Sequence, residues 1–570
     1  MTAFEQAKQD ACAALAAVLP PDAPAPSDAD FVKPPQADMG DLSFPCFGLA
    51  KASKSNPAAL AKDLAGKIAP SGLIAEAKAV GPYLNFFFDK KAFSAAVIKE
   101  VVDRAGEYGN ASKRDEKVLI EYGSPNTHKE IHVGHLRNFA LGLAVERLLR
   151  AAGADVTAVN YIGDVGAHVA KWLWYVEKKM PGEFTSSARS EMPTFGKMYT
   201  EAIKLYESDE EKYKPEVSAV LQALELHDKK WEELWLQTRD MCLAQIDVIF
   251  KQLDIHFVRT YLESEVEGPG KALVQELLAK GIAKEGERGA KIVDLEPEGL
   301  GVMLVLKSDG TALYSTKELA LAKLKFKEFP ETMKSLHVVD NRQSLYFKQL
   351  FVVLKKMGFD KSMAHLAYDF VTLEEGAMSS RKGNIVTYED FRDRMIDMVA
   401  NETRSRREEW SAEKVAEVAW VIAEGAMKFG MLKQDNDRPI VFNMEAALSF
   451  DGFTGPYIQY AHARLCSILA RAGDDGAEYE TSDDSEEYTL LRLVADFPAT
   501  VLASAASYRP SLLAQYLFDL AQASNDFYRD APVLAAEPRV RARRLAVIRA
   551  TKIALTNGLS LLGIRAPEEM

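Results

Sequence analysis

The sequence predicts an α/β protein in which a parallel sheet is preceded by a small α+β unit and followed by an all-helical unit. Three observations in residues 118–164 support the sheet. The apolar run Val118–Tyr122 is typical of a buried strand, a helical pattern follows it, and Val156–Tyr161 is a second strand-like run. Gly153 ends the helix between them. A strand, a helix and a strand in this order form a parallel βαβ unit.

The loop after the first strand carries the motif His132-Val133-Gly134-His135. In a βαβ unit this loop lies at the carboxyl edge of the sheet, where the helix N-terminus offers free N–H groups and partial positive charge to a phosphate. Gly134 allows a nucleotide to approach the backbone, and the two imidazoles can donate hydrogen bonds to phosphate oxygens. The tetrapeptide alone also fits a metal-binding pair or two histidines that cap the helix.

The composition is that of a globular protein large enough for several domains, with 570 residues of which 48% are hydrophobic and 27% charged. The net charge of −13 argues mildly against a nucleic-acid partner, although local basic faces matter more than the sum. Four widely spaced cysteines indicate reduced thiols in a cytoplasmic protein. Because the chain has no long charge-free apolar run and no basic N-terminal region, we expect neither a membrane span nor a signal peptide.

We expect three domains. Residues 1–113 combine an amphipathic helix at Phe4–Leu19 with an apolar strand at Val80–Phe88, which predicts a small α+β module. Residues 395–570 show 3.6-residue periodicity throughout, which predicts an all-helical domain.

The middle domain, residues 114–394, contains the βαβ unit. A helical segment rich in Lys, Glu and Trp, from about residue 172 to 253, interrupts the alternation of strands and helices and indicates an insertion between the two halves of the sheet. Sheet-like runs return at Val302–Leu306 and His337–Val339.

The residues around the histidine motif narrow its interpretation. Ser124-Pro125-Asn126, Lys129 and His132–Asn138 together resemble the first signature of class I aminoacyl-tRNA synthetases, and of arginyl-tRNA synthetases in particular. Tyr161–Gly166 resembles the GDWG element of that family, with valine where tryptophan is usual. The resemblance implies a Rossmann-type nucleotide-binding catalytic domain with an inserted helical segment.

The resemblance extends to both ends of the chain. The pattern from Gly40 to Phe88 is similar to the family's N-terminal additional domain, which contacts the tRNA elbow. Gly452–Arg464 and Asn525–Tyr528 resemble its anticodon-binding helical domain, which implies Tyr460 and Tyr528 as anticodon-binding residues. Basic residues on or before the last helix lie beside aromatics suited to stacking on bases, although such a cluster is usually a solvated face. They are Arg539, Arg541, Arg543, Arg544, Arg549 and Lys552.

The segment Tyr314-Ser315-Thr316-Lys317-Glu318 resembles the family's YxTRD element, with Glu in place of Asp and Lys in place of Arg. On a helix, Tyr314 and Glu318 share one face, and a carboxylate beside an aromatic ring suits a guanidinium. Their spacing alone favours an ordinary surface pair. The arginine-binding residues that the resemblance implies are Ser124, Asn126, Glu263, Tyr314, Glu318 and Gln343.

Residues 365–387 resemble the second class I signature, KMSKS, written here as MSSRKG. Both signature lysines are missing, because Ala377 and Ser380 occupy their positions. A loop with Gly, Ser, Arg381 and Lys382 suits a triphosphate, and a solvated basic loop is the alternative. The implied ATP-binding residues are Gly134, His365, Met378, Ser380, Arg381 and Lys382.

The implied catalytic residues are His132, His135 and Lys129. In family members whose KMSKS-like loop, here called the flap, lacks the signature lysine, a lysine at the position of Lys129 is thought to supply the missing charge. The alternative is that Lys129 is a solvated loop residue, as most lysines are.

The activity that the resemblance implies is ligation of arginine to tRNA(Arg). ATP and L-arginine form arginyl-adenylate while Mg²⁺ neutralises the pyrophosphate, and the arginyl group then passes to the 3′-terminal adenosine. We expect no tightly bound metal, no membrane association and a monomer. Two alternatives are a cysteinyl- or glutamyl-type class I synthetase, which would lack the paired acids, and a non-catalytic tRNA-binding paralogue, against which the intact histidine motif argues.

Overall fold

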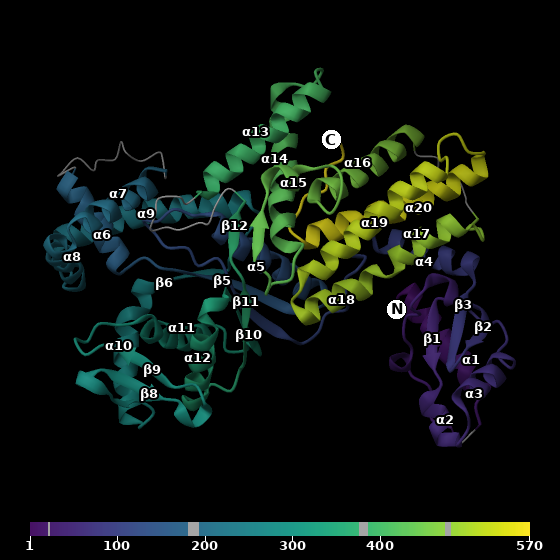
Figure 1. Cartoon of the computed structure of the whole chain (residues 1–570), viewed down its shortest axis with the longest axis horizontal. Coiled ribbons are helices and arrows are strands. Elements are labelled where there is room, and N and C mark those ends of the chain that lie inside the picture. The colour runs from purple at the N-terminus through teal and green to yellow at the C-terminus, as the bar shows by residue number, and fades with distance from the viewer. Residues whose placement is uncertain (21–22, 180–192, 375–385, 474–479) are drawn as a thin grey trace.

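The computed structural model describes residues 1–20, 23–179, 193–374, 386–473 and 480–570 (Figure 1). At its centre lies a parallel five-stranded sheet of order β11-β10-β4-β5-β6. The predicted α/β class and the βαβ unit are therefore confirmed, with α5 (Val133–Ala151) as the connecting helix. The strands are β4 (Lys117–Glu121), β5 (Asp155–Ile162), β6 (Arg259–Leu262), β10 (Lys334–Asp340) and β11 (Ser362–Tyr368).

The order of the strands reverses between β4 and β10. From β4 the chain proceeds outward to β5 and β6, and it then returns to the other side of β4 to form β10 and β11. The loops after β4 and β10 consequently diverge, and a crevice opens at the carboxyl edge of the sheet between them. Ligands bind at this point in open α/β sheets.

The helix α5 is buried on nearly every side, because the sheet covers one face and C-terminal helices cover the other (Figure 1). Its apolar residues Leu136, Phe139 and Leu148 are fully buried. Gly142 faces the buried ring of Tyr122, and a side chain there would overlap that ring.

Two insertions separate the strands of the sheet. The first consists of α6 (Ala167–Lys179), α7 (Pro193–Ser208), α8 (Glu210–Glu225) and α9 (Lys229–Gln252), and it is the predicted helical segment. Its predicted place between the two halves of the sheet is wrong, because it connects β5 and β6, which are neighbours on one side of β4. The second consists of α10 (Glu263–Ala279), β7 (Lys284–Glu285), β8 (Lys291–Asp294), β9 (Val302–Leu306) and α11 (Tyr314–Glu328), which lie between β6 and β10. α12 (Ser344–Lys356) then connects β10 to β11.

Of the two returning strand runs, only His337–Val339 belongs to the parallel sheet. The run Val302–Leu306 is a strand as predicted, but it belongs to a separate antiparallel three-stranded sheet with β7 and β8. Its burial alternates, with Met303 buried and Leu304 exposed, as in a sheet that covers a core on one face only. β10 is instead buried over four consecutive residues in its centre.

The N-terminal unit lies at the end of the molecule away from the parallel sheet (Figure 1). The single predicted strand Val80–Phe88 is a hairpin, because Gly81, with a φ of 58°, turns the chain between two strands. A third strand completes an antiparallel sheet of order β1-β3-β2, with helices packed on it. The elements are α1 (Ala3–Ala16), β1 (Leu42–Pro45), α2 (Phe47–Ser53), α3 (Pro57–Ala65), β2 (Ile74–Val80), β3 (Tyr83–Phe88) and α4 (Lys90–Arg104).

Within the described residues of the C-terminal part, the regular structure is helical except for one strand, β13 (Ile440–Phe442), which pairs with β12 (Val371–Leu373) from the middle of the chain. The expectation of helix throughout is wrong at this strand. The first C-terminal helix, α13 (Tyr388–Arg406), passes through residue 394 without a break. The other helices are α14 (Ala412–Leu432), α15 (Met444–Leu448), α16 (Gly455–Ala472), α17 (Ser485–Ala495), α18 (Phe497–Ser507), α19 (Pro510–Asp530) and α20 (Pro538–Leu561).

One apolar segment, Ser485–Ser507, has the length and composition of a membrane span, and half of it is buried. It consists of two helices, α17 and α18, which meet at Asp496. Leu491 and Val501 are buried within the helical bundle. Packing in the core accounts for its composition.

A pair of glycine substitutions tests the packing of α5. Gly142→Ala should destabilise the protein by about 1–3 kcal/mol, because the added methyl group forces Tyr122 out of its place in the core. Gly48→Ala on α2, where nothing lies within 4 Å of the new methyl group, is the matched control and should leave stability unchanged or slightly raised. Thermal unfolding of both variants measures the difference, and equal melting temperatures would contradict this account of the packing.

Candidate active site

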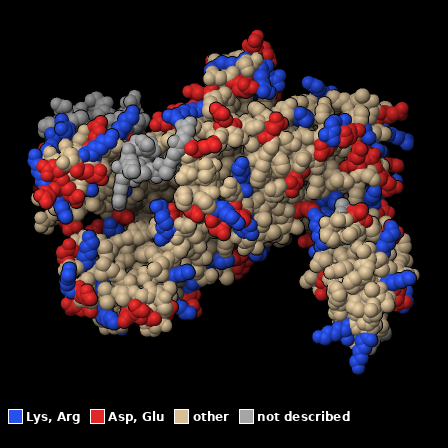
Figure 2. All heavy atoms as spheres, viewed as in Figure 1, with Lys and Arg blue, Asp and Glu red and all other residues tan. Residues whose placement is uncertain are grey.

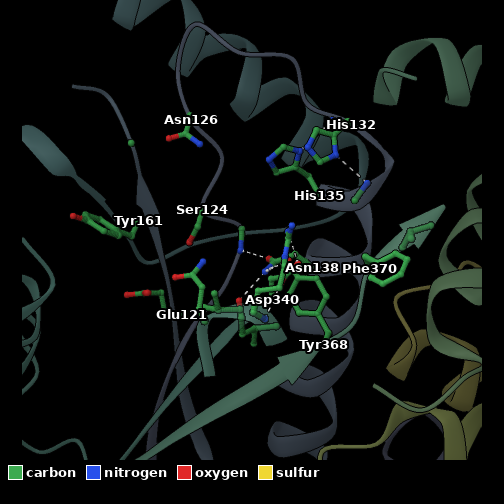
Figure 3. A pocket seen from close by; sticks show the side chains of 18 of the residues that line it. Glu121, Ser124, Asn126, His132, His135, Asn138, Tyr161, Asp340, Tyr368 and Phe370 are labelled. Carbon is green, nitrogen blue, oxygen red and sulfur yellow. Dashed lines mark hydrogen bonds and ion pairs between the residues drawn. The ribbon is translucent and has the colours of Figure 1, made fainter. Parts of the chain in front are cut away.

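A cavity of about 780 Å³ opens in the crevice at the carboxyl edge of the sheet (Figure 3). Its walls come from the loop after β4, the N-terminus of α5, the ends of β5 and β10, and the strand β12. Segments that are far apart in the sequence therefore meet around one space. The predicted site residues that line it are Ser124, Asn126, His132, Gly134, His135, Glu263, Tyr314 and Gln343.

The remaining predicted residues lie elsewhere. Lys129, Glu318 and His365 are near the cavity but are not part of its lining. Met378, Ser380, Arg381 and Lys382 fall outside the described residues. Tyr460 and Tyr528 belong to the C-terminal helices α16 and α19.

The two motif histidines lie side by side at the N-terminus of α5, with ring centroids 3.9 Å apart (Figure 3). Nδ1 of His132 accepts the N–H of Gly134 at 3.1 Å, and Nδ1 of His135 accepts the N–H of His132 at 3.1 Å. Both histidines thus cap the helix. Among the residues that the structure describes, no group of three or more potential ligands surrounds a metal position.

The caps determine which nitrogen of each ring carries the proton. Burial, and then the charge of Lys129, lower the pKa of His132 to about 4, and burial lowers the pKa of His135 well below its usual range. Both rings are therefore neutral at pH 7. Because each Nδ1 accepts a hydrogen bond, the proton lies on Nε2, which remains a donor. Helix capping and hydrogen-bond donation to a phosphate are therefore compatible.

Two buried asparagines that sequence reasoning missed hold the loop after β4. The N–H of Gly123 donates to Oδ1 of Asn138 at 2.6 Å, and the N–H of Ser124 donates to Oδ1 of Asn160 at 2.8 Å. Ser124 has a φ of 49°, a left-handed conformation that a non-glycine residue adopts at a cost. These bonds stabilise a strained turn that directs Ser124 and Asn126 toward the cavity (Figure 3).

Acidic groups gather beneath the opposite side of the cavity. Glu121, at the end of β4, forms a buried ion pair with Lys325 at 2.7 Å, and His337 lies 3.6 Å from its other oxygen. Burial alone would raise the pKa of Glu121, but Lys325 and His337 together hold it at about 2. Sequence reasoning missed this pair, because 204 residues separate its two members.

Glu318 lies next to that pair and is only 1% exposed. Its Oε1 has no hydrogen-bond partner. Burial, and then the charge of Glu121, raise its pKa to about 8. Tyr314 lies between Glu318 and the cavity, with its ring partly exposed and its hydroxyl end buried beside the carboxyl group. Glu318 thus forms the floor beneath Tyr314 and carries a proton at neutral pH.

Glu263, the third acid, is paired with Lys317 at 2.9 Å. Lys317 is the residue that departs from the family's arginine at this position, and here it neutralises an acid of the site. Asp164, in the GDWG-like element, accepts the N–H of Ser264 at 2.9 Å and its hydroxyl at 2.6 Å. That element therefore fixes the N-terminus of α10, on which Glu263 stands.

Lys129 lies close to the histidines although it does not line the cavity. The pKa of Lys129 is lowered overall, because burial and the nearby charge of Lys171 outweigh the opposite effect of Glu263. Its ammonium group lies 5.6 Å from the ring centre of Tyr199 on α7. It is a largely buried cation rather than a solvated one, and its field lowers the pKa of both motif histidines.

His365 on β11 does not line the cavity. Its ring stacks on Phe347 at 4.6 Å, and Nε2 donates to the carbonyl of Val339 at 2.9 Å. Tyr368 and Phe370, which follow it, line the cavity instead.

Comparison with known proteins agrees with this geometry. Three family models match the chain: the arginyl tRNA synthetase N terminal domain over residues 3–88, the tRNA synthetases class I (R) catalytic domain over 97–444, and the DALR anticodon binding domain over 458–570. An arginine–tRNA ligase of Bdellovibrio bacteriovorus is 40% identical over 552 residues, which are 95% of this chain and 94% of that protein. This chain belongs to the arginyl-tRNA synthetase family.

Solved structures of the family have the same fold. The arginyl-tRNA synthetase of Thermus thermophilus superposes with a TM-score of 0.80 at 28% identity, covering 98% of this chain and 99% of that one. The enzyme of Plasmodium falciparum has a TM-score of 0.75 at 18% identity, over 100% of this chain and 98% of that one, which shows the fold alone. The predicted family and fold class are confirmed.

The segment matched by the anticodon-binding model carries a second group of exposed side chains. Tyr460 is 39% exposed and Tyr528 43% exposed. The guanidinium of Arg464 lies 4.7 Å from one ring centre and 5.5 Å from the other, and it donates to Asn525 at 2.7 Å. α16 and α19 thus present two aromatic rings joined by one cation.

Several arginines of α20 bond to their own chain rather than extending beside these rings. Arg543 pairs with the buried carboxylate of Glu487 at 2.6 Å. Arg541 donates to the carbonyl of Ala472 at 2.9 Å, and Arg544 donates to that of Pro532 at 2.7 Å. These bonds pack α20 against its neighbours, and a role of the basic residues in binding nucleic acid stays a prediction.

Proposed function

We propose that this protein is an arginine–tRNA ligase whose cavity binds ATP at the N-terminus of α5 and L-arginine above the buried acids. One observation carries the proposal: a single cavity has two neutral imidazole donors at one side and three carboxyl groups, on Glu121, Glu263 and Glu318, at or beneath the other. The first suits a phosphate and the second suits a guanidinium.

The charge count supports a cationic side chain as the substrate. Lys325 and Lys317 neutralise Glu121 and Glu263, so Glu318 is the acid without a counter-ion. A guanidinium above Tyr314 supplies the missing positive charge and stacks on the ring. Asn126 and Gln343 remain to bind the backbone end of the amino acid. A cysteinyl- or glutamyl-type enzyme would have no use for these acids.

The protein supplies positioning and charge stabilisation for the chemical step. The substrate carboxylate attacks the α-phosphorus of ATP, and pyrophosphate leaves with its Mg²⁺, which enters with the nucleotide. His132 and His135 donate through Nε2 to the phosphate oxygens, Gly134 keeps the backbone accessible, and Lys129 adds positive charge from the same loop. The flap residues Met378, Ser380, Arg381 and Lys382 complete the ATP site in this proposal.

tRNA(Arg) then accepts the arginyl group at its 3′-terminal adenosine. The rings of Tyr460 and Tyr528 stack on anticodon bases. Residues 1–113 bind the tRNA elbow, and the basic side chains at the tip that α2 forms support this assignment (Figure 2). Elsewhere on the face shown, acidic and basic side chains are intermixed (Figure 2).

We further propose that the enzyme is a cytoplasmic monomer that needs no membrane. Its four cysteines, Cys12, Cys46, Cys242 and Cys466, are free thiols, as suits a reducing compartment. Pyrophosphate exchange with each of the twenty amino acids, with and without tRNA, tests the activity. Exchange with arginine alone among them is expected, and exchange with another amino acid or with none would refute the proposal.

Arginine should bind more tightly as the pH rises from 6 to 8. Because the pKa of Glu318 is about 8 in the free protein, its carboxyl group is protonated below that pH, whereas a bound guanidinium favours the ionised form. Binding then releases one proton, and the Kd should fall by up to about tenfold per pH unit below pH 8 and level off above it.

Titration calorimetry in two buffers of different ionisation enthalpy measures the released proton. Glu318→Gln should remove both the proton release and the pH slope, whereas Glu263→Gln, which keeps the buried acid, should retain them. A wild-type Kd independent of pH between 6 and 8 would refute this role of Glu318.

Lys129→Ala should lower the rate of arginine activation by two or more orders of magnitude, a loss of about 3 kcal/mol of transition-state stabilisation. The KM for arginine should change little, because the contact belongs to the transition state. Lys171→Ala, which removes a neighbouring cation stacked 3.9 Å from the ring centre of Tyr206, is the matched control and should retain most activity. If Lys129→Ala keeps the wild-type activation rate and Lys382→Ala loses most of it, the flap supplies the positive charge instead.

Tyr528→Ala should weaken tRNA charging by about 1–3 kcal/mol through loss of a stacking contact, and arginine-dependent chemistry in the cavity should remain intact. Aminoacylation kinetics with tRNA(Arg) and with an anticodon-swapped tRNA measure the effect. If the variant charges tRNA like the wild type, and the swapped tRNA is charged equally well, the C-terminal helices do not recognise the anticodon.

A further inference from the structure

One buried cation takes no part in the chemistry above. Arg137 lies on α5, two residues after His135, and is 1% exposed. Burial lowers the pKa of its guanidinium to about 10, so it stays charged at neutral pH. Among the described residues it forms no ion pair, and the charge of Asp369 offsets the effect of burial on its pKa only in part. A buried charge without a paired carboxylate is costly and calls for a compensating set of hydrogen bonds.

That set consists of four backbone carbonyl groups. Nη1 of Arg137 donates to Asp369 at 2.7 Å and to Phe370 at 3.4 Å, and Nη2 donates to Asp435 at 3.2 Å and to Asn436 at 3.1 Å. Each of the two terminal guanidinium nitrogens therefore binds a separate loop. Only a planar fork with several N–H groups can serve both loops at once.

The first loop forms part of the cavity. Asp369 and Phe370 lead from β11 into β12, and Phe370, Val371 and Thr372 line the side of the cavity next to the α5 N-terminus. The second loop leads into β13, which pairs with β12. The loops also bond directly, because the N–H of Asp369 donates to the carbonyl of Asn436 at 2.9 Å.

The second loop is in turn held by the C-terminal helices. Arg509 forms a two-pronged ion pair with Asp435, and the hydroxyl of Ser511 donates to the same carboxylate at 2.6 Å. Nδ2 of Asn436 donates to the carbonyl of Tyr508 at 2.9 Å. These residues join α18 to α19, the helix that carries Tyr528 near its other end. A continuous series of polar contacts thus runs from the start of α19 to the cavity wall.

We propose that Arg137 is a positioning residue for the nucleotide side of the cavity, and that it is the joint through which the α18–α19 connection holds the wall Phe370–Thr372 in place. The inference rests on the proposed function in one respect only, namely that ATP occupies the cavity. When the fork is lost, buried carbonyl groups are left without donors and the wall shifts relative to the α5 N-terminus, while the acids under Tyr314 stay where they are.

Arg137→Lys is the first test, because it keeps the charge but cannot satisfy four carbonyl groups. Pyrophosphate exchange should show a KM for ATP raised about tenfold or more and a KM for arginine within about twofold of wild type. The melting temperature should fall, because buried carbonyl groups lose their donors. Arg147→Lys is the matched control. Arg147 stands on the same helix and donates to the carbonyl of Ser560 at 2.6 Å, far from the cavity wall, so both KM values should stay the same.

A KM for ATP within twofold of wild type, or equal increases in both KM values, would overturn the proposal.

If Arg137→Lys does not fold, Arg509→Gln decides, because this half-exposed residue holds the second loop from outside. It should raise the KM for ATP about threefold with the arginine KM unchanged, and no change would overturn the proposed joint. Calorimetric binding of ATP alone gives the same readout for all variants. A shifted wall would weaken ATP binding in the variants alone. If the wild type itself shows no arginine-dependent exchange, the proposed function is refuted instead.

Discussion

The N-terminus of α5 is the constraint on which the rest of the structure depends. A helix that begins inside a protein must satisfy its first N–H groups, and here two histidines do so through Nδ1. Their Nε2 protons are thereby left for a ligand. Because the helix is buried on nearly all sides, its first turn cannot move independently of the sheet below it or of the C-terminal helices above it.

The side of the cavity opposite this helix is organised by charge. The buried lysines Lys325 and Lys317 pair with Glu121 and Glu263, whereas burial and the charge of Glu121 raise the pKa of Glu318 so that it holds a proton. Such an arrangement is stable without a ligand because the neutral acid avoids a buried negative charge. In the proposed function it favours a cationic ligand, since a positive charge nearby stabilises the ionised form of Glu318. The same burial that lowers the pKa of the histidines at one end raises the pKa of the acid at the other.

The two ends of the cavity are joined to different parts of the molecule. The acids stand on β4, α10 and α11, within the sheet and its second insertion. The wall at Phe370 depends on α5 and on loops held by the C-terminal helices, with Arg137 between them. This division gives the C-terminal helices a direct polar connection to the cavity wall next to the α5 N-terminus.

Sequence alone determined the features that depend on local spacing and on motif residues. The βαβ unit, the helical insertion, the histidine motif and the family follow from periods of two and 3.6 residues and from short ordered motifs, and eight predicted site residues line one cavity. Tertiary structure decided which charges meet, because such pairs join residues hundreds of positions apart, as Glu121 and Lys325 show. It moved Val302–Leu306 into a separate sheet, turned His365 toward Phe347, and set three arginines of α20 to internal bonds. Each outcome depends on what packs against a residue from elsewhere in the chain, and periodicity carries no information about that partner.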